Sequence, residues 1–300
     1  MTKHITKLWC VACLAALWLV YGQVADQPPL SGPPGPTVTC GGKSASIGAW
    51  SAHWTSPATS FVACGDVPTD PYVRKSLKVF TAKPRDTLTI SFPYVPSRLE
   101  VTFQADGKNR GTVLYEGRGK LELPITLSDR CGGVYEVYTE WGLTTLGSGS
   151  AACGFLVLDE TQPPILTVLG EGQGVSAWRG SYQWRRPVGG GVMEGVDSDS
   201  PHPVDGAENL PVLYAQPGER VELYCDRTPD RLAVWVYPNA SQDLGRVVPL
   251  EVSVHDGGAD DLLVLPEDCG GAVFEVRGTW QGASPTGAGG QVNYAFRIEP

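Results

Sequence analysis

Residues spaced for metal binding or catalysis are scarce in this chain of 300 residues. Neither the Gly-x-Ser-x-Gly motif of serine hydrolases nor the His-Glu-x-x-His motif of zinc proteases occurs in it. Asp197, Asp199 and Glu208 resemble the acids of a calcium loop, but Pro201 and His202 stand where that loop needs an acid and a glycine. A turn rich in aspartate is the alternative. We therefore expect no metal and no cofactor.

The start of the chain has the layout of a secretory signal peptide. Lys3 and Lys7 precede an unbroken apolar run at residues 8–20, which is shorter than the roughly 20 residues of a membrane span. Small residues allow cleavage near Gly22 or Ala25. The sequence thus predicts a secreted or extracytoplasmic protein with no transmembrane segment in the mature chain, and it leaves open an anchor through the N-terminus.

Two halves of the chain repeat the same pattern. Trp54 and Trp184 follow Pro-Pro pairs at the same distance, and "DRCGGVYEVYTEW" (129–141) matches "EDCGGAVFEVRGTW" (267–280). A period of about 130 residues is the size of a whole domain. We therefore predict a tandem duplication. Its segments are a signal peptide at 1–22, a linker at 23–32, a first copy at 33–160 and a second copy at 161–300.

Each copy has the alternation of β-strands. In "DTLTISF" (86–92), "RLEVTFQ" (98–104) and "VFEVRGTW" (273–280), apolar residues occupy every second position, which is typical of half-buried antiparallel strands. About eight short strands per copy predict an all-β fold of two tandem immunoglobulin-like antiparallel β-sandwich domains. The tryptophans that recur in both copies are then expected to lie in the core.

The cysteines beyond the leader are even in number, which in an exported chain indicates disulfides. They are Cys40, Cys64, Cys131, Cys153, Cys225 and Cys269. No Cys-x-x-Cys spacing favours a metal instead. The second copy contains two of them, so we expect a Cys225–Cys269 bridge.

The first copy allows three pairings of its four cysteines. A hairpin turn centred near Gly147 would place Cys131 some ten residues, or roughly 30 Å, along the strand from Cys153. This is too far for a disulfide, whose Cα atoms lie within about 7 Å. We therefore reject Cys131–Cys153 and predict Cys64–Cys131 and Cys40–Cys153.

One difference between the copies suggests a binding surface. Tyr224, Trp235 and Tyr237 have the opposite parity to the inward residues of their strands, and their counterparts in the first copy are polar. Exposed aromatics mark contacts with glycans, peptides or proteins. The alternative is that this face packs against the other domain or a crossing strand.

A family resemblance accompanies these patterns. "GSYQW" followed by acids, "PGERVELY" and "GGAVFEV…W…YAF" resemble a little-characterised extracytoplasmic domain of Firmicutes lipoproteins and secreted proteins. The resemblance covers both copies, although the first has "SAHW" for "GSYQW" and Cys153 in place of Tyr294. It implies an exported, β-rich protein and no particular activity.

Charge and motifs together favour a binding role. Without the leader's two lysines the chain has 21 basic and 32 acidic residues, a net charge of −11, which argues against nucleic acid and anionic membranes as partners. We therefore predict a secreted, non-enzymatic binding or spacer protein that contacts a glycan, peptide or protein at the cell surface. The alternative is an exported hydrolase with a site between the domains, which clustered histidine, serine and carboxylates in a cleft would favour.

Overall fold

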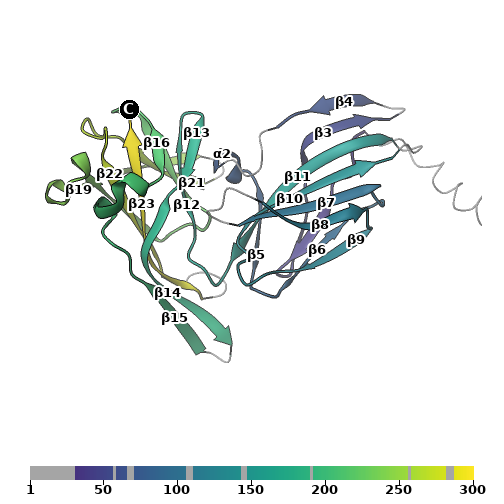
Figure 1. The fold of residues 1–300 in the computed structure, drawn as a ribbon, viewed down its shortest axis with the longest axis horizontal. Helices are drawn as coiled ribbons and strands as arrows, with labels where there is room; N and C mark the ends of the chain where they lie inside the picture. Colours follow the sequence, from purple (N-terminus) through teal and green to yellow (C-terminus); the bar gives the residue numbers. More distant parts are fainter. Residues whose placement is uncertain are drawn as a thin grey trace, which may run out of the picture.

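The computed structural model describes residues 31–56, 59–65, 71–105, 111–142, 147–189, 192–255, 258–281 and 287–300. In these residues the chain is all-β and forms four sheets, which pack in pairs as two β-sandwiches (Figure 1). We call them the N-terminal and the C-terminal sandwich. The predicted signal peptide lies outside the described residues.

The N-terminal sandwich pairs a four-stranded and a seven-stranded sheet. The smaller sheet has the order β2-β1-β6-β9 and comprises β1 (Thr37–Cys40), β2 (Lys43–Ser46), β6 (Thr87–Ser91) and β9 (Glu122–Thr126). The larger has the order β4-β3-β11-β10-β7-β8, with β5 beside β11, and comprises β3 (Ala49–Thr55), β4 (Ser60–Ala63), β5 (Lys78–Ala82), β7 (Arg98–Ala105), β8 (Thr112–Arg118), β10 (Gly133–Trp141) and β11 (Ser148–Asp159).

The C-terminal sandwich pairs a five-stranded and a seven-stranded sheet. The smaller has the order β13-β12-β17-β21-β20 and comprises β12 (Leu166–Gly170), β13 (Gln173–Ser176), β17 (Arg220–Cys225), β20 (Leu250–His255) and β21 (Gly258–Val264). The larger has the order β15-β14-β23-β22-β18-β19, with β16 beside β23, and comprises β14 (Trp178–Gly189), β15 (Val192–Ser198), β16 (Val212–Tyr214), β18 (Arg231–Tyr237), β19 (Arg246–Val248), β22 (Val273–Trp280) and β23 (Gly289–Glu299).

Strand order matches between the two sandwiches, except that β20 has no counterpart in the first. Each sandwich has more than the eight strands expected from the sequence, because edge strands of three or four residues, such as β16 and β19, are too short to show an alternating pattern. The predicted alternation is confirmed on β6 and β7, but not at the start of β22, where Val273 and Glu275 are buried as well as Phe274 and Val276. Leu88 and Ile90 on β6, and Leu99 and Val101 on β7, are fully buried between the sheets.

A tryptophan pair fills the same place in each core. Trp54 on β3 packs edge-to-face on Trp141 with ring centres 5.9 Å apart, and Trp184 on β14 packs in the same way on Trp280, also at 5.9 Å. All four are buried. The prediction that they are core residues is confirmed, and edge-to-face packing of this kind contributes beyond the apolar area that it buries.

A short helix joins the two sandwiches. Helix α2 (Pro71–Arg74) belongs to the N-terminal half of the chain but packs on β12 and β13 of the C-terminal sandwich (Figure 1). Arg74 forms a bidentate ion pair with Asp226, with Nε–Oδ1 and Nη2–Oδ2 distances of 2.9 and 2.7 Å. Lys75 pairs with Glu222 at 2.8 Å. These contacts fix one sandwich against the other.

The predicted disulfides are wrong: all six described cysteines are free. Cys225 ends β17, whereas the loop before Cys269 meets the other end of that strand, where the amide of Leu265 donates to the carbonyl of Glu219. The six steps from Glu219 to Cys225 span roughly 20 Å. Cys225 and Cys269 are the only two cysteines of the second copy, but the direction of β17 places them too far apart to pair.

The first-copy pairings fail for a related reason. Cys64 follows the edge strand β4, which β3 and β11 separate from β10, so Cys131 lies several strands away. Cys40 ends β1 close enough to Cys131 for the two thiols to interact electrostatically, whereas Cys153 lies opposite Val137, further along β10. The rejected pair Cys131–Cys153 is not formed either, although the register places Cys153 opposite Val137 and not as far from Cys131 as the predicted turn required.

Candidate functional site

The three aromatic residues predicted to form a binding face do not share one. Tyr224 lies on β17 of the smaller sheet, and Trp235 and Tyr237 lie on β18 of the larger sheet. Whether a residue is at an odd or even position decides which face of its sheet it occupies, but it does not decide which of the two sheets its strand joins. Tyr224 instead lies beside Asp226 where α2 docks, and burial together with that carboxylate raises the pKa of its phenol to about 12.

Tyr237 is a buried residue rather than a contact surface. It packs with Ala207, Leu210 and Val273 beneath a 3₁₀ segment at Pro203–Asn209, and its hydroxyl donates to Glu275 at 2.9 Å. Trp235 is partly buried beside this cluster, with the Arg277 guanidinium 4.1 Å from its ring centre. The face is therefore covered, as the alternative expected, but by the 3₁₀ segment rather than by a crossing strand or the other domain.

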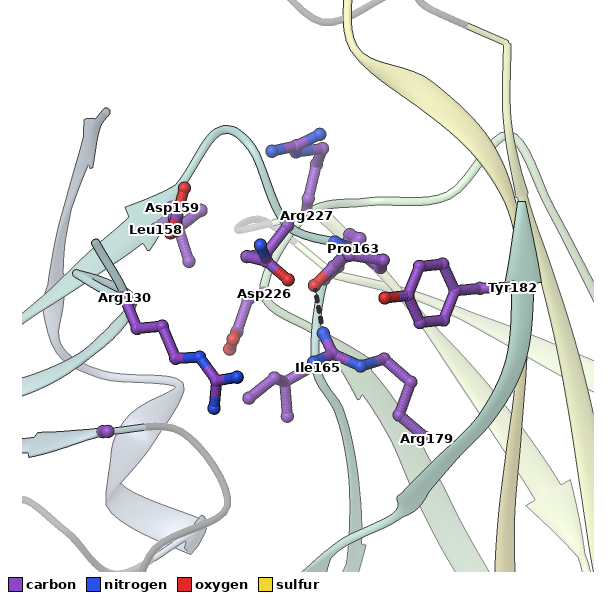
Figure 2. A pocket seen from close by; sticks show the side chains of 13 residues that line it. Arg130, Leu158, Asp159, Pro163, Ile165, Arg179, Tyr182, Asp226 and Arg227 are labelled. Carbon is purple, nitrogen blue, oxygen red and sulfur yellow. Dashed lines mark hydrogen bonds between the residues drawn. The ribbon is translucent and has the colours of Figure 1, made fainter. Parts of the chain in front are cut away.

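A cavity of about 360 Å³ lies where the two sandwiches meet (Figure 2). Its walls come from both of them: the loop before β10 and the end of β11 on one side, and the start of β14 and the residues after β17 on the other. The segment that connects β11 to β12 forms the remainder. This is a common position for ligand sites.

The connecting segment is held firmly against the C-terminal sandwich. Its Pro163-Pro164 pair favours an extended backbone, because proline restricts its own φ and the conformation of the residue before it. The carbonyl of Pro163 accepts from Arg179 at 2.9 Å, and that of Pro164 accepts from the buried hydroxyl of Tyr294 at 2.7 Å. The cavity is thus preformed, with a wall of restrained backbone.

Two carboxylates line the cavity, and both are engaged in structural contacts. Asp226 is held in the bidentate pair with Arg74, and its side chain is 1 % exposed. Asp159 ends β11, and its Oδ1 accepts from the amide and the hydroxyl of Thr161 at 2.8 and 2.6 Å. Its Oδ2 is buried and has no hydrogen-bond partner among the described residues.

Two arginines point into the cavity from opposite sandwiches. Figure 2 shows the guanidinium groups of Arg130 and Arg179 directed toward the same space. The hydroxyl of Tyr182 lies beside the Arg179 guanidinium. The Arg179 guanidinium lies 5.6 Å from the Tyr182 ring centre. Neither arginine forms an ion pair with a carboxylate of the described residues. The lining therefore holds two solvent-exposed arginines without an ion-pair partner among the described residues, alongside two carboxylates that are engaged elsewhere.

A third arginine of the lining, Arg227, has a different environment. Its side chain points away from Arg130 and Arg179 in Figure 2 and lies over the Trp184 ring at 5.4 Å. Its Nη1 is buried without a described partner, and burial lowers the pKa of the guanidinium. Its carbonyl accepts from Trp280 Nε1 at 3.1 Å. Arg227 thus joins the cavity to the core of the C-terminal sandwich.

The lining combines arginines, carboxylates and a tyrosine. The described residues that line the cavity include the carboxylates Asp159 and Asp226 but no serine or histidine, so only part of the cluster that would favour the hydrolase alternative is present. No group of three histidine, cysteine or acidic residues in the described part of the chain is placed to hold a metal ion. Within the described residues no helix is long and apolar enough to cross a membrane.

Sequence reasoning missed the cavity, although the copies carry a signal for it. Arg130 precedes a cysteine in the first copy where the second copy has Asp268, and Arg179 stands where the first copy has Ala49. Asp268 forms a surface pair with Arg246 instead. Each copy therefore has an arginine at the junction where the other copy has a different residue. Only the packing of the two sandwiches brings Arg130 and Arg179 to the same cavity.

Comparison with known proteins adds no family assignment. No model of a known protein family matches the chain, and a search of curated proteins finds no significant relative.

Proposed function

We propose that this chain is an exported, non-enzymatic binding protein whose ligand enters the cavity between its two sandwiches. The observation that carries the proposal is that both sandwiches line one preformed cavity, walled by the connecting segment 160–165. A duplicated domain that acted only as a spacer would not need such a junction. The buried Arg74–Asp226 pair supports the proposal, because it keeps the cavity open in one geometry without a ligand.

Export is part of the proposal and is supported by the leader. Lys3 and Lys7 precede the apolar run, and both copies resemble an extracytoplasmic domain. Expression in a secreting host followed by mass spectrometry of the released protein tests this directly. We expect a mature chain that begins at Gln23 or Asp26. A retained chain that still carries residues 1–22 would show that the segment is an anchor.

The binding role is tested by blocking the cavity without changing its charge. Gln162 lines the cavity from the connecting segment, so a Gln162→Trp substitution would fill the space with an indole. Thermal unfolding of the wild type is measured against a panel of monosaccharides, oligosaccharides and short peptides. A ligand that binds only the folded state raises the melting temperature. We expect at least one such shift, and we expect Gln162→Trp to abolish it.

Two outcomes would overturn the proposal. If Gln162→Trp leaves every shift unchanged, the ligand binds elsewhere. If NMR spectra of a bound compound show that it is consumed on incubation with the wild type but not with Gln162→Trp, the cavity is an enzyme site and the hydrolase alternative replaces the binding role.

A further inference from the structure

We infer that the cavity between the sandwiches binds an oxyanion, a carboxylate or phosphate group of its ligand, between Arg130 and Arg179. The inference depends on the proposed binding role and identifies the chemistry that the ligand must have. Its basis is the convergence of two guanidinium groups from different sandwiches on one space, together with the surrounding charges.

The charges around the cavity favour an anionic ligand. Arg130 and Arg179 are both solvent-exposed and carry like charges directed at the same space (Figure 2), so an anion bound between them would reduce their screened repulsion and accept charge-assisted hydrogen bonds. The two carboxylates of the lining form no ion pair with either arginine. Asp226 is paired with Arg74, and Asp159 accepts from Thr161 through Oδ1. A ligand that brings its own negative charge would relieve the repulsion.

Donor geometry provides the second argument. A guanidinium group presents a planar fork of N–H donors that matches a carboxylate or a phosphate. One Nη1 donor of Arg179 is used on the carbonyl of Pro163, and this bond holds the group in its orientation toward the cavity. The hydroxyl of Tyr182 points into the same space and supplies a further neutral donor. The site thus offers donors from three side chains to one acceptor group.

Size provides the third argument. A volume of about 360 Å³ exceeds what a bare anion fills and is suited to a small molecule of sugar size. The lining also includes the Tyr182 ring, Pro163 and Ile165, which can contact the uncharged part of a ligand. We therefore assign the ligand to small molecules or chain ends that carry an acidic group.

Three compounds on one scaffold test the inference. Glucuronate carries a carboxylate, glucose 6-phosphate carries a phosphate, and glucose carries neither. Binding to the full chain is measured by titration calorimetry at low salt. We expect one or both acidic sugars to bind and glucose to bind at least tenfold more weakly. Tighter binding of glucuronate would identify the ligand's acidic group as a carboxylate. Tighter binding of glucose 6-phosphate would identify it as a phosphate.

Variants then connect the affinity to the arginines. Arg130→Gln and Arg179→Gln each remove a charge-assisted hydrogen bond, so each is expected to weaken the acidic sugar roughly tenfold or more. Arg185→Gln is the matched control. It removes one charge from the same strand as Arg179 but lines a different cavity, and it is expected to leave the affinity unchanged. The melting temperature of each variant verifies its fold.

The inference and the proposed function fail in different ways. If glucose binds as tightly as the acidic sugars and neither arginine variant changes this, while Gln162→Trp abolishes binding, the cavity is a binding site but not for an oxyanion. If none of the three compounds binds at millimolar concentration, the oxyanion assignment is overturned, and the wider panel alone decides the binding role. If Arg185→Gln weakens the binding of the acidic sugar as much as the other two variants, the effect comes from the net charge of the chain. That result would also overturn the assignment.

Discussion

Arg74 and Asp226, which are 152 residues apart in the chain, form a bidentate ion pair with side chains only 9 % and 1 % exposed. The pair links the helix of the N-terminal half to the strand end that borders the cavity between the sandwiches. A buried pair of this kind adds little net stability over an apolar contact, but removal of one partner leaves an isolated buried charge. The pair therefore sets how the sandwiches meet.

Arg74→Ala is expected to lower the free energy of unfolding by about 3–5 kcal/mol, because the Asp226 carboxylate stays buried without its guanidinium partner. Urea unfolding followed by tryptophan fluorescence measures the change. Lys75→Ala is the control: Lys75 is 36 % exposed, and exposed pairs such as Lys75–Glu222 contribute about 0–1 kcal/mol. Equal effects of the two substitutions would show that the Arg74–Asp226 pair does not fix the junction.

Glu136 is expected to destabilise the N-terminal sandwich at neutral pH. Burial, and then the nearby Glu100 carboxylate, raise its pKa above the usual range. Protonated Glu136 thus contributes stability below a pH of about 4.3, and this contribution is lost as the pH rises through its folded-state pKa. Glu136→Gln is expected to raise stability at pH 7 by about 0.5 kcal/mol after solvent screening, and to have no effect near pH 3.

Thermal melts at both pH values test this, with an expected gain of about 1–2 °C at pH 7. Glu140→Gln is the matched control on the same strand. Glu140 accepts a hydrogen bond from Arg98 at 3.3 Å, so its loss is expected to be neutral or mildly destabilising. A gain with both variants would indicate a general response to net charge rather than the burial of Glu136.

Cys64 is expected to be the one rapidly alkylated thiol among the six described cysteines, because it alone is exposed. Iodoacetamide labelling of the native protein at pH 8, followed by peptide mapping, measures this. Burial raises the pKa of Cys40 to about 11 and that of Cys153 to about 12, which leaves little thiolate to react. Complete labelling in urea is the control. A linked Cys225–Cys269 peptide in unreduced samples would contradict the strand direction of β17.

Gly290 is expected to tolerate no side chain. It lies opposite both Trp184 and Trp280, and a Cβ atom there would lie 1.9 Å from the carbonyl oxygen of Gln183. Gly290→Ala forces β14 and β23 apart and is expected to cost about 1–3 kcal/mol. Gly195→Ala, where no atom lies within 4 Å of the added carbon, is expected to change stability by less than about 0.5 kcal/mol. Urea titration compares the two variants.

Sequence alone determined the features that repeat with a short period. Alternation along 86–92 and 98–104 placed Leu88, Ile90, Leu99 and Val101 in the core, where the structure has them. The recurrence of Trp54 at Trp184 identified the largest core side chains of both sandwiches. These inferences succeed because the period of two is a local property of an extended strand, and a buried face imposes it on the residues of that strand.

Tertiary structure decided everything that depends on which strands become neighbours. Tyr224 and Tyr237 each have the parity opposite to the inward residues of their own strand, yet they belong to different sheets and different environments. Cys225 and Cys269 were the only pair available by count, yet they lie toward opposite ends of β17. Arg130 and Arg179 come from different sandwiches, and neither has a local pattern that marks it. The physical reason is that strand order and the junction between sandwiches arise from contacts between residues far apart in the chain, and no short window of sequence contains both partners.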